Sequence, residues 1–445
     1  MKNLFVFGGR DIGESYLQAI KNLEKEKYWD IKFQLADSRN GNAKGNVVNI
    51  RHFLNDKWLV KYPYLIRDYQ SGIKTDEKIY EEVYSHLYQF QDCYSRFHDY
   101  KFFEFHFDIN YFNLLLNFFY SVFRKEKIDL VIFSAPPHHG VDNIIYWLAR
   151  AMNIQVLSFE AVGNFLNKMA CIDKIEDIGI YHRLEKQVAE SDLRIPREFK
   201  KDLYYMAKVR PLRRPRLRLR DICRPRDKMA RLYRYLLNRT YYKNMKSRIK
   251  EIDYSKKYVY FGLHFQPEST TSAMGGIYCD QLLAVERLRA LLPDDWFIYV
   301  KEHPVQDAFM RPDIFFKRLD VIPNTQFISP AENTYRLLEH AQFAATITGT
   351  LGYEAITGGK PALIFGHVWY KQCPGVFRYH ENLNYQDIIN FKIDHEELEN
   401  SINELLRRCC DGTVDASASI HVKDYDQAAE TERMTIFLRN IVSEL

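Results

Sequence analysis

The chain is 445 residues long, and 46% of its residues are hydrophobic. This length exceeds what one ordinary hydrophobic core needs, so two domains are expected, and the apolar content argues against global disorder. The cysteines are scattered without a C-x-x-C pair or a metal-binding spacing, which predicts reduced thiols and a cytoplasmic protein. No apolar stretch reaches the roughly 20 residues that cross a bilayer, and the N-terminal stretch is too short for a signal peptide.

The net charge of +5 is unevenly distributed along the chain. Residues 208–250 hold 17 of the 63 Lys and Arg residues but only two of the 58 Asp and Glu residues, so the rest of the chain is acidic. Two interpretations of this segment stay open: a solvated linker, and a patch that binds an anionic membrane surface or a polyanionic acceptor. Nucleic acid is not expected as a partner, because the segment lacks a recognised nucleic-acid-binding module.

Residues 1–165 are predicted to form a first doubly wound α/β domain. An apolar run at 4–7 ends in a glycine pair and is followed by a helical pattern, which is typical of a strand, a turn and a helix. The continuous apolar run 129–135 predicts a parallel strand that is covered on both faces. A further strand is expected at 154–160, and it ends at Glu160.

The remainder of the chain divides into three predicted parts. Residues 166–255 have no clear strand pattern and are expected to form a helical, basic linker. Strands and helices alternate again at 256–385, which predicts a second doubly wound domain, and residues 386–445 are expected to be helical. Strands of the second domain are expected at 258–265, 296–302, 343–348 and 361–366.

Ligands of open parallel sheets bind beyond the carboxyl ends of the strands, and polar clusters occupy these positions. The first cluster covers residues 301–304, where Lys301 and His303 are candidates to donate charge-assisted hydrogen bonds to a phosphate. Pro304 would fix the turn that aims them. The alternative is a surface turn with incidental charges.

The second cluster covers residues 348–355, between a buried strand and the start of a helix. Glycine and hydroxyl residues there allow backbone N–H groups to approach an oxyanion, and the helix dipole adds to phosphate binding. Thr348, Gly349 and Thr350 are the candidate phosphate contacts, and Glu354 is a candidate to bind ribose hydroxyls. The alternative is an ordinary capped helix.

A third cluster at 264–268 follows the first strand of the second domain and contains Gln266 and Glu268. It is expected to face a cleft between the domains. In the first domain, Gly9 and Arg10 follow the first strand, and Arg10 is a candidate clamp for a phosphate or a carboxylate. The alternative for these residues is a purely structural turn.

Metal-dependent chemistry is not expected from the motifs. His138 and His139 are adjacent, but no carboxylate partner is recognised beside them at ligand spacing. A D-x-D pattern at 424–426 follows the last expected strand and is interpreted as surface. The chain has neither a Walker-type loop nor a G-x-S-x-G motif.

Four segments together resemble the capsule polysaccharide biosynthesis family of GT-B glycosyltransferases, which includes relatives of bacterial Kdo transferases and sialyltransferases. The segments are HFQPE (264–268), VKEHP (300–304), TGTLGYEAITGGKP (348–361) and LIFG (363–366). The resemblance is strong in the second domain and faint in the first. It implies a GT-B-like fold of two Rossmann-like domains that face a cleft. It also implies that the second domain holds a sugar nucleotide and that no other cofactor is needed.

The resemblance implies roles for residues of the second domain. His303 and Pro304 match the His-Pro pair that contacts the phosphate of a CMP-activated sugar. Thr348 and Thr350 match hydroxyl residues that contact the same phosphate. From the chemistry, His303 would stabilise the charge that develops on the departing phosphate, together with Lys301 and backbone N–H groups nearby.

The acid–base residues are assigned less directly. Glu160 is the nearest match to the acidic residue that deprotonates the acceptor in such enzymes, although the family's tight acidic pair is missing before Gly163. If the stereochemistry is retained, a carboxylate would attack the sugar carbon, and Glu268 or Asp280 is the candidate nucleophile.

The predicted function is therefore transfer of an acidic sugar in the synthesis of a bacterial surface polysaccharide of the capsule or lipopolysaccharide type. The sugar would be Kdo, sialic acid or a related nonulosonic acid, carried by CMP and moved to a hydroxyl of a glycan or glycolipid. The enzyme is expected in the cytoplasm, as a peripheral protein of the inner face of the cell membrane if the basic segment docks there. A UDP-sugar 2-epimerase-like enzyme and a non-catalytic partner in capsule assembly or export are the alternatives.

Overall fold

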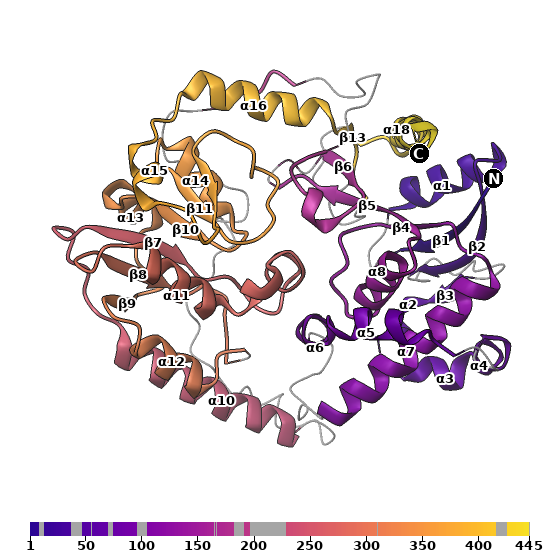
Figure 1. Ribbon diagram of the computed structural model, residues 1–445, viewed down its shortest axis with the longest axis horizontal. Helices are drawn as coiled ribbons and strands as arrows, with labels where there is room; N and C mark the ends of the chain where they lie inside the picture. Colours follow the sequence, from indigo (N-terminus) through magenta and orange to yellow (C-terminus); the bar gives the residue numbers. More distant parts are fainter. Residues whose placement is uncertain are drawn as a thin grey trace. The chain divides into compact units, whose positions relative to one another are not determined.

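The computed structural model describes residues 1–8, 13–36, 47–54, 56–69, 74–95, 105–163, 165, 167–181, 191–195, 228–308, 310–414 and 425–444. Within this part the chain forms two compact units (Figure 1). The first unit takes its described residues from Met1–Phe97, Glu104–Asp192 and Asn403–Leu445, and the second from Leu193–Ile402. Each unit contains one largely parallel sheet with helices on both faces, so the predicted α/β class with two doubly wound domains is confirmed.

The first unit contains a sheet in the order β13-β6-β5-β4-β1-β2-β3. Strands β1 to β5 pair with one another in parallel. Strand β6 runs antiparallel to β5, and β13 runs antiparallel to β6. The direction of winding changes between β1 and β4, which is the topological switch point of this sheet. The strands are β1 (Lys2–Phe7), β2 (Trp29–Ala36), β3 (Val47–Asn49), β4 (Leu130–Phe133), β5 (Gln155–Ala161), β6 (Lys168–Ile172) and β13 (Cys410–Asp411).

Helices cover both faces of the first sheet. They are α1 (Glu14–Lys25), α2 (Ile50–Phe53), α3 (Lys57–Lys61), α4 (Pro63–Tyr69), α5 (Glu77–Tyr84), α6 (Leu87–Tyr94), α7 (Phe105–Lys125), α8 (Val141–Ala151) and α18 (Gln427–Glu444). The last four residues of β1, Leu4–Phe7, are apolar because they are buried on both sides of the sheet. Leu4 and Val6 pack in the core formed with α1 and α18, while Phe5 contacts Phe119 and Phe123 of α7.

The second unit contains a fully parallel sheet in the order β12-β11-β10-β7-β8-β9, with its switch point between β7 and β10. The strands are β7 (Tyr258–Gly262), β8 (Phe297–Lys301), β9 (Thr325–Ile328), β10 (Ala344–Thr346), β11 (Ala362–Ile364) and β12 (Val376–Arg378). The helices are α10 (Lys228–Arg248), α11 (Gln281–Leu291), α12 (Asp313–Asp320), α13 (Thr334–His340), α14 (Thr350–Thr357), α15 (Tyr385–Asn390) and α16 (His395–Arg407), in which the chain passes from the second unit to the first.

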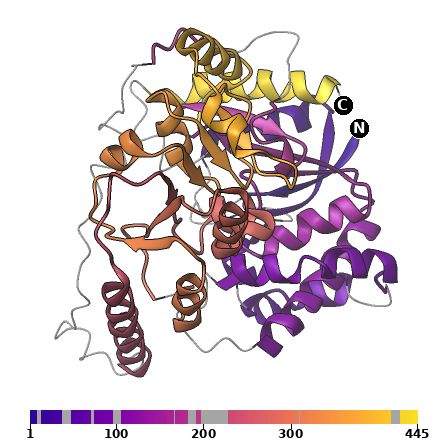
Figure 2. The same cartoon turned by 60° about the vertical axis from the view of Figure 1, so that its left-hand side comes forward.

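The core of the second unit lies between the sheet and helices α10, α11 and α12. Val259 and Phe261 of β7 and Ile298 and Val300 of β8 point into this core, because alternate side chains of a strand share a face. Helix α10 lies at the periphery of the unit (Figures 1 and 2), and Tyr241 in its second half is buried in the same core. Residues 166–255 were expected to form a helical linker, and the second half of α10 within them packs in the core of this unit.

Two strands of the first sheet lie in parts of the chain where the sequence predicted no strand. Residues 166–255 were expected to contain no strand, yet β6 lies within them, and the helical C-terminal part was not expected to contribute β13. Strand β6 has five residues, of which the last four are buried, and β13 spans only two residues. Segments this short do not show a period that separates strand from helix.

Among the helices that the structure describes, none is both long enough and apolar enough to span a membrane.

Candidate functional site

The candidate site lies at the carboxyl edge of the second sheet, at its switch point. The three polar clusters predicted from the sequence follow β7, β8 and β10, which are neighbours in this sheet. Because these strands are parallel, their carboxyl ends meet at one edge, and the structure brings His264, His303 and the start of α14 together there.

His264 links the exits of β7 and β10. Its Nε2 lies 2.7 Å from the Thr346 hydroxyl oxygen and accepts the Thr348 backbone N–H at 3.4 Å. A backbone N–H only donates, so Nε2 is unprotonated. Burial, assisted by the charges of His303 and Arg311, lowers the pKa of His264 to about 3. His264 is therefore a neutral acceptor that fixes the turn before α14.

Gly349 is required at this turn because the backbone passes very close to His264. A Cβ atom at this position would lie 2.7 Å from the Thr346 hydroxyl oxygen and 3.0 Å from Nε2 of His264. Gly349 is the N-cap residue of α14, and its N–H donates to the Thr346 hydroxyl oxygen at 3.2 Å. The Tyr370 hydroxyl donates to the Gly349 carbonyl. The positive end of the α14 dipole is thus held rigidly at the switch point.

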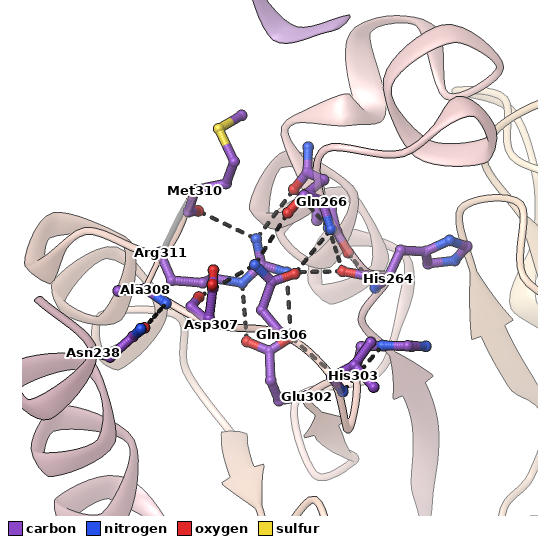
Figure 3. Close-up of polar contacts among 12 residues, drawn as sticks. Asn238, His264, Gln266, Glu302, His303, Gln306, Asp307, Ala308, Met310 and Arg311 are labelled. Atoms are coloured by element: carbon purple, nitrogen blue, oxygen red, sulfur yellow. Dashed lines mark hydrogen bonds and ion pairs between the residues drawn. The ribbon is translucent and has the colours of Figure 1, made fainter. Parts of the chain in front are cut away.

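His303 is prepared to donate a hydrogen bond. Its Nδ1 accepts the backbone N–H of Val305 at 3.4 Å, and the backbone N–H of His303 donates to Oε1 of Glu302 at 2.9 Å (Figure 3). Burial, followed by the charges of Arg311 and Lys301, lowers the pKa of His303 to about 4. With Nδ1 engaged as an acceptor in a neutral ring, the proton resides on Nε2, which is the form that donates to an anion.

Behind His303 lies a buried network centred on Arg311, which the sequence analysis missed (Figure 3). Arg311 donates to Glu302, to the Gln266 side-chain oxygen at 3.1 Å and to the His264 carbonyl at 3.0 Å. Gln281 also donates to the Gln266 side-chain oxygen, at 2.7 Å. The sequence shows Arg311 shortly before α12, but it does not show the pairing of Arg311 with Glu302, because that pairing is a tertiary contact.

Two predicted ligand-binding residues serve the protein itself. Gln266 is buried, and its amide nitrogen donates to the Cys279 carbonyl at 2.6 Å. The Thr348 hydroxyl donates to the Thr270 carbonyl at 2.7 Å. In this structure these side chains shape the loops around the site.

Lys301 takes a different direction from the one expected. Its ammonium group donates to the Glu332 carbonyl and to the Thr334 hydroxyl, both at 2.7 Å, and so holds the turn before α13. Burial lowers the pKa of Lys301 to about 8, against the opposing charges of Glu332 and Glu354. Glu354 is also buried, in α14. Pro304 and Thr350 are partly exposed at the strand exit and at the first position of α14.

The two carboxylates considered as nucleophiles are in different environments. Asp280 accepts a hydrogen bond from Arg318 at 2.6 Å, and the same arginine pairs with Glu286. Glu268 is exposed, in the loop after β7.

In the first unit, Glu160 lies near the end of β5 and is 6% exposed. Its carboxylate accepts a hydrogen bond from the Tyr181 hydroxyl at 2.9 Å. Burial of Tyr181, followed by the charge of Glu160, raises the pKa of Tyr181 well above its usual value. Gly9 and Arg10, the candidate clamp after β1, lie outside the described residues, as does Asp424 of the D-x-D pattern.

The expectation that His138 and His139 lack a carboxylate partner is wrong. Asp142, in the first turn of α8, lies 2.9 Å through Oδ2 from Nδ1 of His139. Among the described residues, these three form a group whose potential metal-ligand atoms lie within 4.8 Å of one another. The partner was missed because the loop after β4 folds back on the helix that follows it.

The fold defines a doubly wound α/β protein. The carboxyl edge of its second sheet carries a neutral histidine donor, His303, and the N-terminus of α14. This arrangement suits an anionic ligand. The family model described as capsule polysaccharide biosynthesis protein matches residues 223–386, which is less than half of the chain. This segment therefore belongs to the capsule polysaccharide biosynthesis family, and the resemblance predicted from the sequence is confirmed. No curated protein sequence matches the chain.

Solved structures offer a weak overall likeness. The chain is similar to the β-Kdo 2,7-transferase of KpsC from Thermosulfurimonas dismutans, with 13% identity, a TM-score of 0.29, and coverage of 72% of this chain and 89% of the other. It is similar to the UDP-GlcNAc 2-epimerase from Methanocaldococcus jannaschii, with 13% identity, a TM-score of 0.25 and 99% of both chains covered. It is also similar to HepE from Anabaena, in complex with UDP-glucose, with 10% identity, a TM-score of 0.28 and both chains fully covered.

Proposed function

We propose that the chain is a glycosyltransferase of bacterial surface polysaccharide synthesis that uses a CMP-activated acidic sugar. The sugar would be Kdo, sialic acid or a related nonulosonic acid, and the acceptor a hydroxyl of a glycan or glycolipid. The observation that carries this proposal is the place of His264 between His303, whose charge acts on it, and the N-terminus of α14, which it contacts at Thr348 and Gly349.

The chemistry of the leaving group supports this assignment. When the bond between the sugar and the nucleotide breaks, negative charge grows on the phosphate oxygens. A neutral His303 that carries its proton on Nε2, and the positive end of α14, would stabilise that charge without reorganisation. Glu354 of α14 would accept hydrogen bonds from the ribose.

A single phosphate fits the site better than a diphosphate does. Lys301 and Arg311 are the cationic side chains of the strand exits described above, and both donate to acceptors of the protein. The donors that remain for a ligand are neutral, and these suit the one phosphate of a CMP-linked sugar. A diphosphate would favour a direct contact with an arginine or a lysine.

We further propose that catalysis needs no metal and no cofactor besides the sugar nucleotide, and that the protein works at the inner face of the cell membrane. Helix α10 supports the membrane contact. Leu232, Tyr233 and Leu236 in its first half are 45%, 41% and 47% exposed, within the most basic segment of the chain. An exposed apolar stripe among arginines matches the surface of an anionic bilayer.

A panel of nucleotides tests the donor class. CMP should raise the thermal unfolding midpoint of the full chain more than CDP, UDP or GDP at equal concentration, because the ligand that binds the folded state more tightly stabilises it more. A larger shift with UDP would overturn the CMP assignment and favour the epimerase-like alternative. With CMP-Kdo or CMP-sialic acid as donor, turnover should survive EDTA, and its loss would show that a metal takes part.

A further inference from the structure

Two buried glutamines bind the backbone of the segment that follows β7. Oε1 of Gln281 accepts the His264 backbone N–H at 2.7 Å, and Nε2 of Gln281 donates to the His264 carbonyl at 3.1 Å. The Gln306 side chain does the same at Gln266, where it accepts the N–H at 2.9 Å and donates to the carbonyl at 3.2 Å (Figure 3). Each amide therefore satisfies both backbone groups of one residue, as a neighbouring strand would.

These side chains continue the support of the backbone beyond the end of β7. The pairing of β7 with β8 ends at Gly262, and the Leu263 N–H still donates to the Lys301 carbonyl at 2.9 Å. From the next residue on, the two glutamines take the place of a strand. His264 thus has a fixed backbone position although β7 has ended.

The orientation of the Gln281 amide is set by its partners. A backbone N–H only donates and a carbonyl only accepts, so the two bonds to His264 identify Oε1 and Nε2 of Gln281. The second N–H of Nε2 donates to the Gln266 side-chain oxygen at 2.7 Å. Gln281 is 2% exposed, and its acceptor and both of its donors are engaged. A buried polar network that is satisfied in this way is rigid.

His264 connects this network to the anion site, by which we mean His303 and the N-terminus of α14. The His264 ring contacts Thr346 and Thr348 at the turn before α14, and the charge of His303 acts on it. The fit is tight, because a Cβ atom on Gly349 would lie 3.0 Å from Nε2 of His264. A shift of the His264 backbone would therefore move this turn as well.

A role in stability alone explains less of this arrangement. Helix α11 begins at Gln281, and a side chain that only capped the helix would bind the first turn of α11. The bonds of Gln281 go to the segment after β7 instead. An apolar side chain could fill a similar volume at little cost in stability if the backbone groups had other partners. What the amide adds is one fixed geometry of that segment.

We propose that Gln281 is a positioning residue of the anion site. It holds His264, and through His264 the N-terminus of α14, in the geometry that receives the phosphate of the donor. This inference rests on the proposed function, because the phosphate contact is part of that function. Loss of the Gln281 amide should weaken the binding energy that comes from the phosphate and leave the part that comes from the nucleoside.

The test compares CMP with cytidine, which lacks the phosphate. Calorimetry of the full chain, direct for CMP and by displacement for cytidine, gives the ratio of the two Kd values, and this ratio measures the contribution of the phosphate. Gln281→Met removes the amide at a similar length and without a change in charge. It should lower the ratio about tenfold, as expected when a hydrogen bond to a charged group is weakened. Gln281→Asn draws the amide back by one bond and should lower the ratio too, and it decides the question if Gln281→Met does not fold.

Arg289 provides the matched control at the other end of α11. It is 8% exposed, and its guanidinium group donates to the carbonyls of Leu292, Pro293 and Trp296. Arg289→Met should lower the thermal unfolding midpoint, because it leaves buried carbonyls without these donors. It should leave the ratio of Kd values unchanged, since its contacts lie at the opposite end of the helix from Gln281.

The outcomes separate this inference from the proposed function. A wild-type ratio in the folded Gln281 variants would overturn the inference, while binding of CMP by the wild type would leave the proposed function standing. An equal fall of the ratio in Arg289→Met would also overturn it, since any loss of stability would then suffice. If the wild type binds UDP and not CMP, the proposed donor fails, and UDP and uridine decide on Gln281 in the same comparison. If it binds none of these nucleotides, the proposed function and the inference fail together.

Discussion

Arg311 donates from Nε and Nη2 to the two carboxylate oxygens of Glu302, at 2.9 and 3.2 Å, and the two side chains are 1% and 0% exposed. This pair joins the end of β8 to the segment before α12. Glu302 also accepts the backbone N–H of His303, so the pair sets the position of the histidine that we propose as a phosphate contact.

Arg311→Met should destabilise the chain strongly. The substitution leaves the Glu302 carboxylate buried without its counter-charge, which costs about 3–5 kcal/mol of unfolding free energy. Urea denaturation followed by tryptophan fluorescence measures this loss. The double variant Arg311→Met, Glu302→Leu should recover much of the stability, because it removes both charges.

An exposed ion pair provides the control for this experiment. Lys317 and Asp313 lie on α12 with side chains 64% and 46% exposed. Lys317→Ala should leave the unfolding curve unchanged, because water screens the pair. If Arg311→Met unfolds at the same urea concentration as Lys317→Ala, then Arg311 does not support the site in the way described.

The fold was largely predictable because its main signals are local. Continuous apolar runs such as Leu130–Phe133 indicate strands buried on both faces, and the polar residues that follow them mark the carboxyl edges of the sheets. The directions of side chains were not predictable, because they depend on partners distant in sequence. Lys301 turns to Thr334, and Arg311 binds Glu302 and Gln266.

Some contacts between residues close in the sequence were not predictable either. His139 and Asp142 are only three residues apart, but their contact requires the loop after β4 to fold against the first turn of α8. Gly140 makes this possible with a φ of +85°, a region that other residues rarely adopt. The sequence shows the glycine and the acid, and it does not show that the two meet in one turn.

His303→Ala should weaken the binding of CMP. The variant loses a hydrogen bond to a charged phosphate, which corresponds to about 1.5–3 kcal/mol, or roughly a 10- to 150-fold rise in Kd. Isothermal titration calorimetry of the full chain measures the change. His380→Ala, at an exposed position of the same unit, should bind CMP as the wild type does. An unchanged Kd in His303→Ala would remove this residue from the phosphate site.

The stability of the chain should fall as the pH is lowered from 7 to 5. The pKa of His264 is about 3 in the folded chain, mainly because of burial, against about 6.5 for an unfolded histidine. The unfolded state therefore binds the proton first, so the stability is complete above the unfolded pKa and is lost as the pH falls toward 3. The loss from this residue is about 2 kcal/mol between pH 7 and 5.

A variant without the titrating ring isolates this contribution. His264→Gln should be less stable than the wild type at pH 7, since it loses the contact with Thr346, and its stability should change less between pH 7 and 5. Urea midpoints at the two pH values measure the difference. Equal pH dependence in both proteins would show that His264 titrates normally.

Helix α10 should bind anionic vesicles through its first half. Leu232, Tyr233 and Leu236 are exposed there, whereas Tyr241 and Met245 in the second half are buried in the core of the unit. Apolar side chains can enter the bilayer interface while neighbouring arginines contact the headgroups. Co-sedimentation with vesicles that contain an anionic lipid should therefore be strong at low salt. It should fall steeply as salt rises, because exposed charges are screened over about 8 Å at physiological ionic strength.

Two triple variants with the same change in charge separate docking through α10 from non-specific electrostatic attraction to the vesicles. The variant Arg231, Arg234 and Arg239→Glu changes arginines that precede the buried Tyr241 of α10, and it should lose most of its binding to the vesicles. The variant Lys243, Lys246 and Lys250→Glu changes two lysines in the half of α10 that packs on the protein and one just after the helix, and it should retain most of the binding. Replacing Leu232 and Leu236 by serine should weaken binding without any change in charge. Equal pelleting of the wild type and both triple variants would mean that α10 does not dock on the membrane, and that its basic residues only solvate the helix.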